Sequence, residues 1–311
     1  MNHKNVLITN DVETTSILNH CLSDETGKLV LTQGMPRLLD LYSKYNVKAT
    51  FFFTGYIAQL YPEIVKMILK DGHEIGSHGL THETDKAFDV LDLKTQKDHL
   101  TISKKILEDI SGTEVISFRA PAARVSKDIV IALSETGYKI DSSVSSQRID
   151  MFLSFGSLKK LNWLFTPRKP YFTNKDSIFK SGDSDILEIP ISAAGFPYIG
   201  TFMRISPALN RFTRNMLHVE TKVTGRPFNF LTHPNEFIDE KLINEKIQRR
   251  GSNLLSYWMG DILRHKLKTK NLGQKAIPIF ERELKFFQKK NYDFVTCREL
   301  YKQKLKINAS K

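Results

Sequence analysis

The sequence has little cysteine and no long apolar run. Its two cysteines, Cys21 and Cys297, lie far apart in the chain and form no CxxC pair. A disulfide framework is therefore not expected, and a reducing compartment is the default. No apolar stretch approaches the roughly 20 residues of a membrane-spanning helix, and the opening MNHKNVLITND has no apolar signal-peptide core. We expect a cytoplasmic protein, with attachment at the inner face of the membrane left open.

Acidic residues are also in short supply. They number 34 against 46 basic residues, which gives the 311-residue chain a formal net charge of +12. Most of the excess lies between Asp239 and Lys311, where 18 Lys or Arg residues accompany 8 Asp or Glu residues. Such a segment is usually a solvated helical face, but it can also attract a lipid surface or a phosphate-bearing substrate. Because the chain has no zinc-finger or RNP-type motif, no nucleic-acid partner is expected, while peripheral membrane contact through this segment stays open.

Short β-branched and aromatic runs alternate with segments of helical periodicity. Helices are predicted at 34–46, 62–72, 92–110 and 126–137, and strands at 5–9, 47–55, the start of 73–83, 115–121, 138–144, 186–192 and 228–234. In the strand at 47–55, Gly55 is expected to close the element. Such alternation predicts a parallel α/β sheet or barrel.

The chain shows no internal repeat and no linker. One domain over residues 1–311 is therefore expected, with 145–185 as a long loop because it is polar and aromatic with little periodicity. Residues 239–311 are predicted to form a basic helical segment that ends in a strand and the start of a helix at 292–300.

Unusual polar residues fall at the ends of the predicted strands, where α/β folds place their functional groups. They are Asp11, Glu13, His78, His82, Arg119, Asp141, Glu188 and His233.

His78 and His82 lie four positions apart, the spacing that puts two side chains on one face of a helix turn. Such a pair occurs by chance on surface helices, and an isolated Asp-x-Glu such as Asp11 and Glu13 is usually a solvated turn. Two residues apart at a strand end, however, these two carboxylates share one face. Two histidines with one carboxylate suit zinc or another divalent transition metal, and leave positions open for water and substrate.

Arg119 and His233 each have an ordinary explanation as well as a functional one. Arg119 can cap a strand, but beside two carboxylates it is better placed to orient one of them. A lone histidine at a strand end, such as His233, is more often structural. If a metal activates the attacking water, however, the leaving group needs an acid, and His233 is the foremost candidate.

Several stretches, in a fixed order, resemble the motifs of the polysaccharide deacetylases of the NodB-homology type, carbohydrate esterase family 4. They are TNDVE (9–13), SHGLTH (77–82), FRAPAAR (118–124), YKIDSS (138–143) and FLTHP (230–234), supported by KATFFFTG (48–55) and DGHEIGSH (71–78). The resemblance runs from residue 5 to residue 236. It implies a distorted (β/α) barrel with fewer than eight strands.

The resemblance also implies roles for individual residues. Asp11 matches the catalytic base, His78 and His82 the metal ligands, Arg119 the arginine that holds the base, and His233 the general acid. Leu231 would line the pocket for the acyl methyl, with Pro121 and Ala122 also in contact with substrate. Asp141 lies near the fourth motif, where an aspartate tunes the acid histidine.

The chain departs from the family pattern at three places. Val12 stands where the family has its metal-binding aspartate, so Glu13, one residue later, is the expected third ligand. Ala122 and Ala123 replace a tyrosine and a glycine, which leaves a backbone N–H as the oxyanion donor. The tryptophan common in the fourth motif is absent.

The expected activity is metal-dependent removal of an N-acyl group, foremost N-acetyl, from an amino sugar of a cell-surface polysaccharide or its precursor. The cation is expected to be zinc, with cobalt and nickel as alternatives. Two alternatives remain. NDVETTS (10–16) and GMPRLLDLYSKYN (34–46) also resemble a deformylase of a lipid-linked amino sugar, so a deformylase or deacetylase of a lipid-phosphate-linked amino sugar is the first. The second is a non-catalytic carbohydrate-binding relative. The sequence leaves the oligomeric state open.

Overall fold

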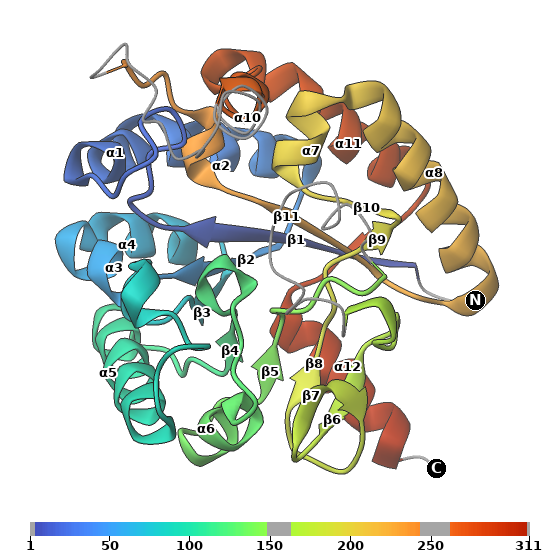
Figure 1. The fold of residues 1–311 in the computed structure, drawn as a ribbon. Coiled ribbons are helices and arrows are strands. Elements are labelled where there is room, and N and C mark those ends of the chain that lie inside the picture. The colour runs from blue at the N-terminus through green and yellow to red at the C-terminus, as the bar shows by residue number, and fades with distance from the viewer. Residues whose placement is uncertain (1–3, 148–162, 243–261, 310–311) are drawn as a thin grey trace.

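Parallel strands form the centre of the computed structural model, which describes residues 4–147, 163–242 and 262–309 (Figure 1). In the described chain, seven of them follow one another in the order β11-β1-β2-β3-β4-β5-β8. Their bounds are β1 (Asn5–Val12), β2 (Ala49–Phe53), β3 (Glu74–Ser77), β4 (Ser117–Phe118), β5 (Ile140–Asp141), β8 (Leu187–Glu188) and β11 (Phe228–Thr232). Strand β12 (Asp293–Phe294) pairs with the first residues of β1.

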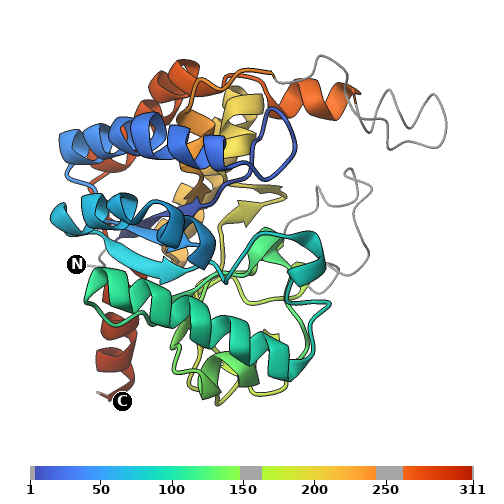
Figure 2. The same cartoon turned by 90° about the vertical axis from the view of Figure 1, so that its left-hand side faces the viewer.

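The central strands are buried along almost their whole length because both faces of the sheet are covered. All five residues of β2, ATFFF, are buried, as a parallel strand with helices outside and side chains inside requires. Helices surround the sheet, and Figure 2 shows α2, then α3 and α4, then α5 stacked down the face it turns to the viewer.

The helices begin and end at the signals expected from the sequence. Helix α2 (Met35–Tyr45) has Pro36 in its first turn and ends at Asn46, which adopts a left-handed conformation (φ 51°). The others are α1 (Asp24–Leu29), α3 (Gly55–Leu60), α4 (Pro62–Lys70), α5 (Leu93–Ser111), α6 (Ile129–Glu135), α7 (Gly200–Ile205), α8 (Pro207–Thr224), α10 (Arg264–Lys268), α11 (Ile277–Lys289) and α12 (Cys297–Ala309). Short π or 3₁₀ turns lie at η1 (Val30–Gly34), η2 (Thr84–Lys86), η3 (Pro121–Ala123), η6 (Pro234–Phe237) and η8 (Gly273–Lys275).

The ring of strands is nearly closed between its first and last members. After β8, the Ser192 N–H donates to the Asn229 carbonyl of β11 over 2.9 Å, and Ile199 forms an isolated parallel bridge with Leu231. The fold is therefore a distorted (β/α) barrel with fewer than eight parallel strands in its ring, and this prediction is confirmed.

Several local predictions were wrong. Gly55 begins α3 rather than closing β2. The segment 145–185 contains the antiparallel hairpin β6 (Tyr171–Asn174) and β7 (Ser177–Ser181), and β6 pairs with β8. Two stretches lie outside the described residues: 148–162 of the predicted loop and 243–261 of the basic segment.

The sequence did not predict a helix or strand at residues 193–227. They hold the small hairpin β9 (Ala193–Ala194) and β10 (Phe196–Pro197), followed by α7 and α8. Among the described residues, no helix is both long enough and apolar enough to span a bilayer.

Candidate active site

The polar residues predicted at strand ends do meet at one edge of the sheet. Asp11 is the second-last residue of β1, and Glu13 follows that strand. His78, Arg119 and His233 come directly after β3, β4 and β11. All of these strands are parallel neighbours, so their carboxyl ends are brought to the same side of the barrel.

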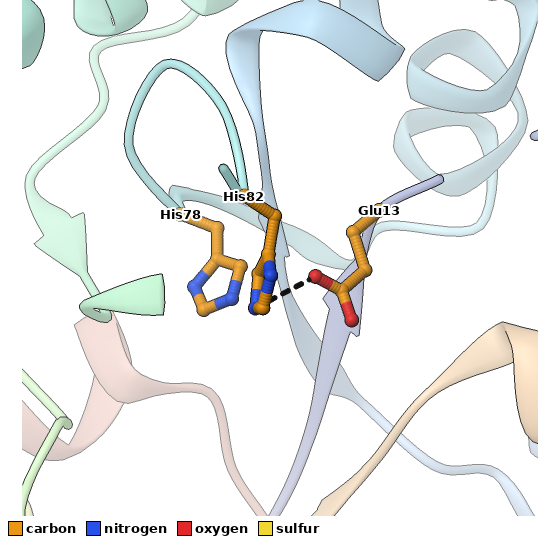
Figure 3. A group of neighbouring side chains, drawn as sticks. All are labelled: Glu13, His78 and His82. Atoms are coloured by element: carbon orange, nitrogen blue, oxygen red, sulfur yellow. Dashed lines mark ion pairs between the residues drawn. The ribbon is translucent and has the colours of Figure 1, made fainter. Parts of the chain in front are cut away.

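Glu13, His78 and His82 form a cluster that fits a metal ion. One ligand atom from each lies within 4.8 Å of the other two, and Figure 3 shows the two rings beside the Glu13 carboxylate. Glu13 Oε2 lies 2.9 Å from His82 Nε2, yet it is buried and accepts no hydrogen bond. A divalent cation would satisfy this oxygen, and one carboxylate with two imidazoles is a donor set that such an ion commonly has.

His78 is held in the tautomer that metal binding needs. Its Nδ1 lies 2.7 Å from the carbonyl oxygen of Arg119. Because a carbonyl can only accept, Nδ1 carries the proton and the lone pair of Nε2 faces the cluster.

The spacing of the two histidines predicted a helix turn, but the structure has no helix at these residues. Residues 78–83 form an irregular loop after β3, and Gly79 adopts a left-handed conformation (φ 74°). The carbonyls of Gly79 and Leu80 accept from the first N–H groups of α3, at 2.9 and 3.0 Å, rather than from a helical turn of their own. The loop turns His82 back toward His78, so the expected meeting of the rings is reached by a different backbone path.

Asp11 is oriented by the buried guanidinium of Arg119. Arg119 Nη1 donates to Asp11 Oδ1 over 2.9 Å, while Arg119 Nε donates to the Ser142 carbonyl over 2.7 Å. The guanidinium also lies over the Phe52 ring, with its carbon 4.4 Å from the centroid. The second oxygen of Asp11 is left 3.8 Å from both His78 Nε2 and His233 Nε2.

His233 has a carboxylate partner that sequence reasoning missed. Its Nδ1 lies 3.1 Å from Glu236 Oε1, and Arg204 Nε donates to Glu236 Oε2 over 3.0 Å. Burial alone would lower the pKa of His233, but Glu236, Asp11 and Glu13 outweigh it and raise that pKa to about 9. The spacing of Glu236, three residues after His233 in the turn η6, was the available signal.

Asp141 does not take the position expected of it. It accepts hydrogen bonds from the Ser143 hydroxyl (2.7 Å) and N–H (3.1 Å), and pairs in register with Glu188. The carboxylate that contacts His233 is therefore Glu236. Burial and the adjacent Asp141 raise the pKa of Glu188 well above its usual range.

The charges within the cluster favour an ionised Glu13. Burial by itself would raise the pKa of Glu13, but His82, His233 and His78 lower it to about 2. Burial lowers the pKa of His78, which keeps that imidazole neutral, as a metal ligand must be. The pKa of His82 is raised, because Glu13 outweighs the opposing effect of burial.

A cavity of about 150 Å³ lies next to Asp11, His78 and His233. Leu231 and Ala122 line it as expected, whereas Pro121 is buried and is not part of its wall. Trp163, from the segment predicted as a loop, also lines it, so an indole is present although the fourth motif has none.

The backbone around Ala122 is unusual. Both Ala122 and Ala123 have positive φ, 52° and 53°, a region that side chains other than glycine rarely adopt. The Ala123 N–H donates to the Ala120 carbonyl over 2.9 Å, so it is engaged in the turn η3. The assignment of a backbone oxyanion donor to this stretch stays a prediction.

A larger cleft, of about 810 Å³, opens beside the metal-binding cluster. Glu13, His82 and His233 lie at its floor, and its walls come from the loop after β1 and from η2, with Arg204 and Asn235.

Comparison with known proteins agrees with this arrangement. Residues 8–140, which include the end of β1, all of β3 and both histidines, match the family model of polysaccharide deacetylase. This part of the chain is similar to the NodB-type polysaccharide deacetylases. The resemblance stated from the motifs is thus confirmed.

Two curated deacetylases illustrate how far the similarity extends. A peptidoglycan deacetylase of Helicobacter pylori is 35% identical over 111 residues, which is 36% of this chain and 37% of that protein. A peptidoglycan-N-acetylglucosamine deacetylase of Bacillus cereus is 36% identical over 104 residues, 33% of this chain and 47% of that protein. The alignments thus span less than half the length of these relatives.

The similarity in fold covers nearly the whole of both chains in one solved structure. The crystal structure of a "probable polysaccharide deacetylase" from Pseudomonas aeruginosa PAO1 superposes with a TM-score of 0.57. The match has 16% sequence identity and covers 95% of this chain and 90% of the other. At that identity it bears on the fold alone.

Proposed function

We propose that this protein is a metal-dependent hydrolase that removes an N-acyl group, foremost N-acetyl, from an amino sugar of a cell-surface polysaccharide or its precursor. The observation that carries the proposal is the meeting of Glu13, His78 and His82 beside Asp11 and His233. The names of the curated relatives, which are deacetylases of peptidoglycan, support the same substrate class.

The residues that would hold the cation are Glu13, His78 and His82. One oxygen and two imidazole nitrogens favour zinc, with cobalt and nickel as alternatives. A bound divalent cation would act as a Lewis acid toward the amide carbonyl and the attacking water.

Asp11 and His233 divide the proton transfers between them. Arg119 fixes one oxygen of Asp11, so the other is presented to the cavity and can accept a proton from the water. His233, with its pKa raised to about 9, carries a proton at neutral pH and can pass it to the departing amine. The two groups border the same small cavity, with His233 Nε2 3.8 Å from Asp11 Oδ2.

The two cavities fit the two parts of such a substrate. The small cavity lined by Leu231, Ala122 and Trp163 can take an acyl methyl group, and the large cleft can take the sugar. A short acyl group is therefore expected, and the cleft leaves room for a neighbouring sugar or a phosphate.

The proposal is tested by release of primary amine from N-acetyl and N-formyl amino sugars, each supplied as free oligosaccharide, peptidoglycan fragment and lipid-linked sugar. Wild type with added zinc is expected to release amine, and Asp11→Asn to lose at least about a hundredfold in kcat/KM. Preference for the lipid-linked substrate would favour the lipid-phosphate alternative.

The non-catalytic alternative makes an opposite prediction. Such a protein would bind glycan without amine release from any of these substrates, in the presence of zinc, cobalt or nickel. Metal content of the purified protein and of His78→Ala separates loss of the metal site from a failure to find the substrate. Wild type without bound metal after incubation with each ion would contradict the proposed chemistry.

A further inference from the structure

The outer face of α8 carries an exposed apolar stripe. Phe212, Met216, Val219 and Val223 are 60%, 47%, 61% and 80% exposed, spaced by four, three and four residues. That spacing places all four side chains on one side of the helix, opposite the buried Arg214, Leu217 and His218. A soluble surface rarely leaves so many large apolar side chains in one row without a partner.

The neighbouring helix α11 adds a row of positive charge. The two helices pack through Arg214, which donates to Glu283 over 3.1 Å, and through His218, whose ring lies 5.4 Å from that of Phe286. On the outward side of α11 lie the exposed Arg282, Lys285 and Lys289, and α8 itself exposes Arg211 and Lys222. Figure 1 shows both helices on the outside of the molecule.

The acidic residues of the two helices compensate only part of this charge. Glu220 pairs with Arg226 over 2.8 Å, Glu283 with Arg214, and Glu281 with Lys44 over 2.7 Å and Lys285 over 3.5 Å. Arg282 and Lys289 are therefore available to an external anion, as far as ion pairs with the described residues show.

We propose that the outward face of α8 and α11 binds the surface of an anionic lipid bilayer. The four apolar side chains of α8 would enter the headgroup region, and the basic row of α11 would contact the lipid phosphates. A symmetric dimer through the same face is less favourable, because an isologous contact brings each basic row near its own copy on a molecule of net charge +12. The inference is independent of the proposed hydrolysis.

Vesicle co-sedimentation of the full chain tests the proposal. Wild type is expected to sediment with phosphatidylcholine vesicles that contain phosphatidylglycerol, and not with phosphatidylcholine alone. Phe212→Glu with Val219→Glu is expected to weaken binding at least about tenfold, as is Arg282→Gln with Lys289→Gln. All four side chains are exposed, so circular dichroism should match that of wild type.

Matched variants separate the surface from the total charge. Val90→Glu with Ile102→Glu changes the charge by the same amount at side chains that are 54% and 46% exposed elsewhere, and Lys66→Gln with Lys70→Gln matches the second pair. Both controls should bind as wild type does. Equal loss in control and test variants would overturn the proposal, as would a wild-type dimer in light scattering that Phe212→Glu dissociates.

Discussion

At the scale of single residues, each reactive group of the site is oriented by one buried partner. Arg119 holds Asp11 through a guanidinium N–H and His78 through its carbonyl, while Glu236 holds His233. Because the partner occupies one atom of each group, the other atom is directed at the cavity. Arg119 therefore links Asp11, the proposed base, to His78, a proposed metal ligand.

Glu236→Gln should lower the pKa of His233. Glu236 is the strongest of the groups that raise this pKa to about 9, so its neutral amide loses most of that support. The rate falls as pH rises through the pKa of the acid, and the alkaline limb of kcat/KM should therefore move to lower pH in the variant. A pH profile of amine release measures the shift.

The control for this variant concerns folding. Glu236 also pairs with the buried Arg204, so the variant should be somewhat less stable, and its melting temperature must be recorded. Glu135→Gln, at an exposed ion pair with Lys97, should leave the profile unchanged. An unshifted alkaline limb in a folded Glu236→Gln protein would show that His233 is not the titrating acid.

At the scale of elements, the loop that carries the two histidines depends on a left-handed glycine. A Cβ on Gly79 would come within 3.1 Å of Phe88 Cε2, at a φ of 74°. Gly79→Ala should thus cost about 1 kcal/mol of stability and displace His82 from His78. We expect zinc affinity to fall at least about tenfold, as measured by competition with a chromogenic chelator.

Gly112→Ala provides the matched comparison. Gly112 has a similar φ of 64° at the end of α5, but an added Cβ meets nothing within 4 Å. It should lose comparable stability and retain full zinc affinity. Equal zinc affinity in both variants would mean that the loop does not need this conformation to bind metal.

The contact between β5 and β8 brings two buried carboxyls together. Burial and Asp141 raise the pKa of Glu188, so the folded state binds its proton more tightly than the unfolded chain does. That contribution to stability is present at acidic pH and is lost as pH rises through the folded pKa, by up to about 1.4 kcal/mol per pH unit.

Glu188→Gln should therefore become more stable than wild type as pH rises above 5. The amide keeps an oxygen for the Val144 N–H, which the Glu188 carboxyl accepts over 3.1 Å, and carries no titrating proton. Urea unfolding at a series of pH values measures the difference. A constant difference between the two proteins across the series would contradict the raised pKa.

At the scale of the whole molecule, the proposed metal ligands come from the ends of two strands of the barrel. Glu13 follows β1 and His78 and His82 follow β3, with β2 between them in the sheet. A ligand that binds only the folded state stabilises it by about 2.7 kcal/mol at a hundred times its Kd. A chelator should accordingly lower the melting temperature of the zinc-loaded protein, and added zinc should restore it.

His82→Ala distinguishes this effect from a general action of the chelator. The variant keeps the barrel but lacks one ligand, so chelator and zinc should change its melting temperature little. If wild type and His82→Ala respond alike, the stabilising ion is bound elsewhere in the chain.

The sequence was most informative where a chemically distinctive residue falls at the end of a predicted strand. Parallel strands place their carboxyl ends at one edge, so Asp11, Glu13, His78, Arg119 and His233 could be expected to meet before any coordinates were known. The apolar residues of β1, β2 and β11 predicted the centre of the barrel, because strands that are buried on both faces are rich in apolar residues. The positions of the short strands β4, β5 and β8 were predicted correctly, but each is shorter than the sequence indicated.

Tertiary structure decided what depends on contacts between distant segments. The pairing of Glu236 with His233 and Arg204, the placement of Trp163 against the small cavity, and the hairpin of β6 and β7 on β8 follow from packing that local periodicity does not encode. The backbone of the histidine loop likewise depends on hydrogen bonds to the N–H groups of α3, in addition to the left-handed Gly79 of the loop itself. The residue types alone determined which reactive groups this protein has. The fold determined which neighbouring residue fixes the protonation state and the orientation of each group.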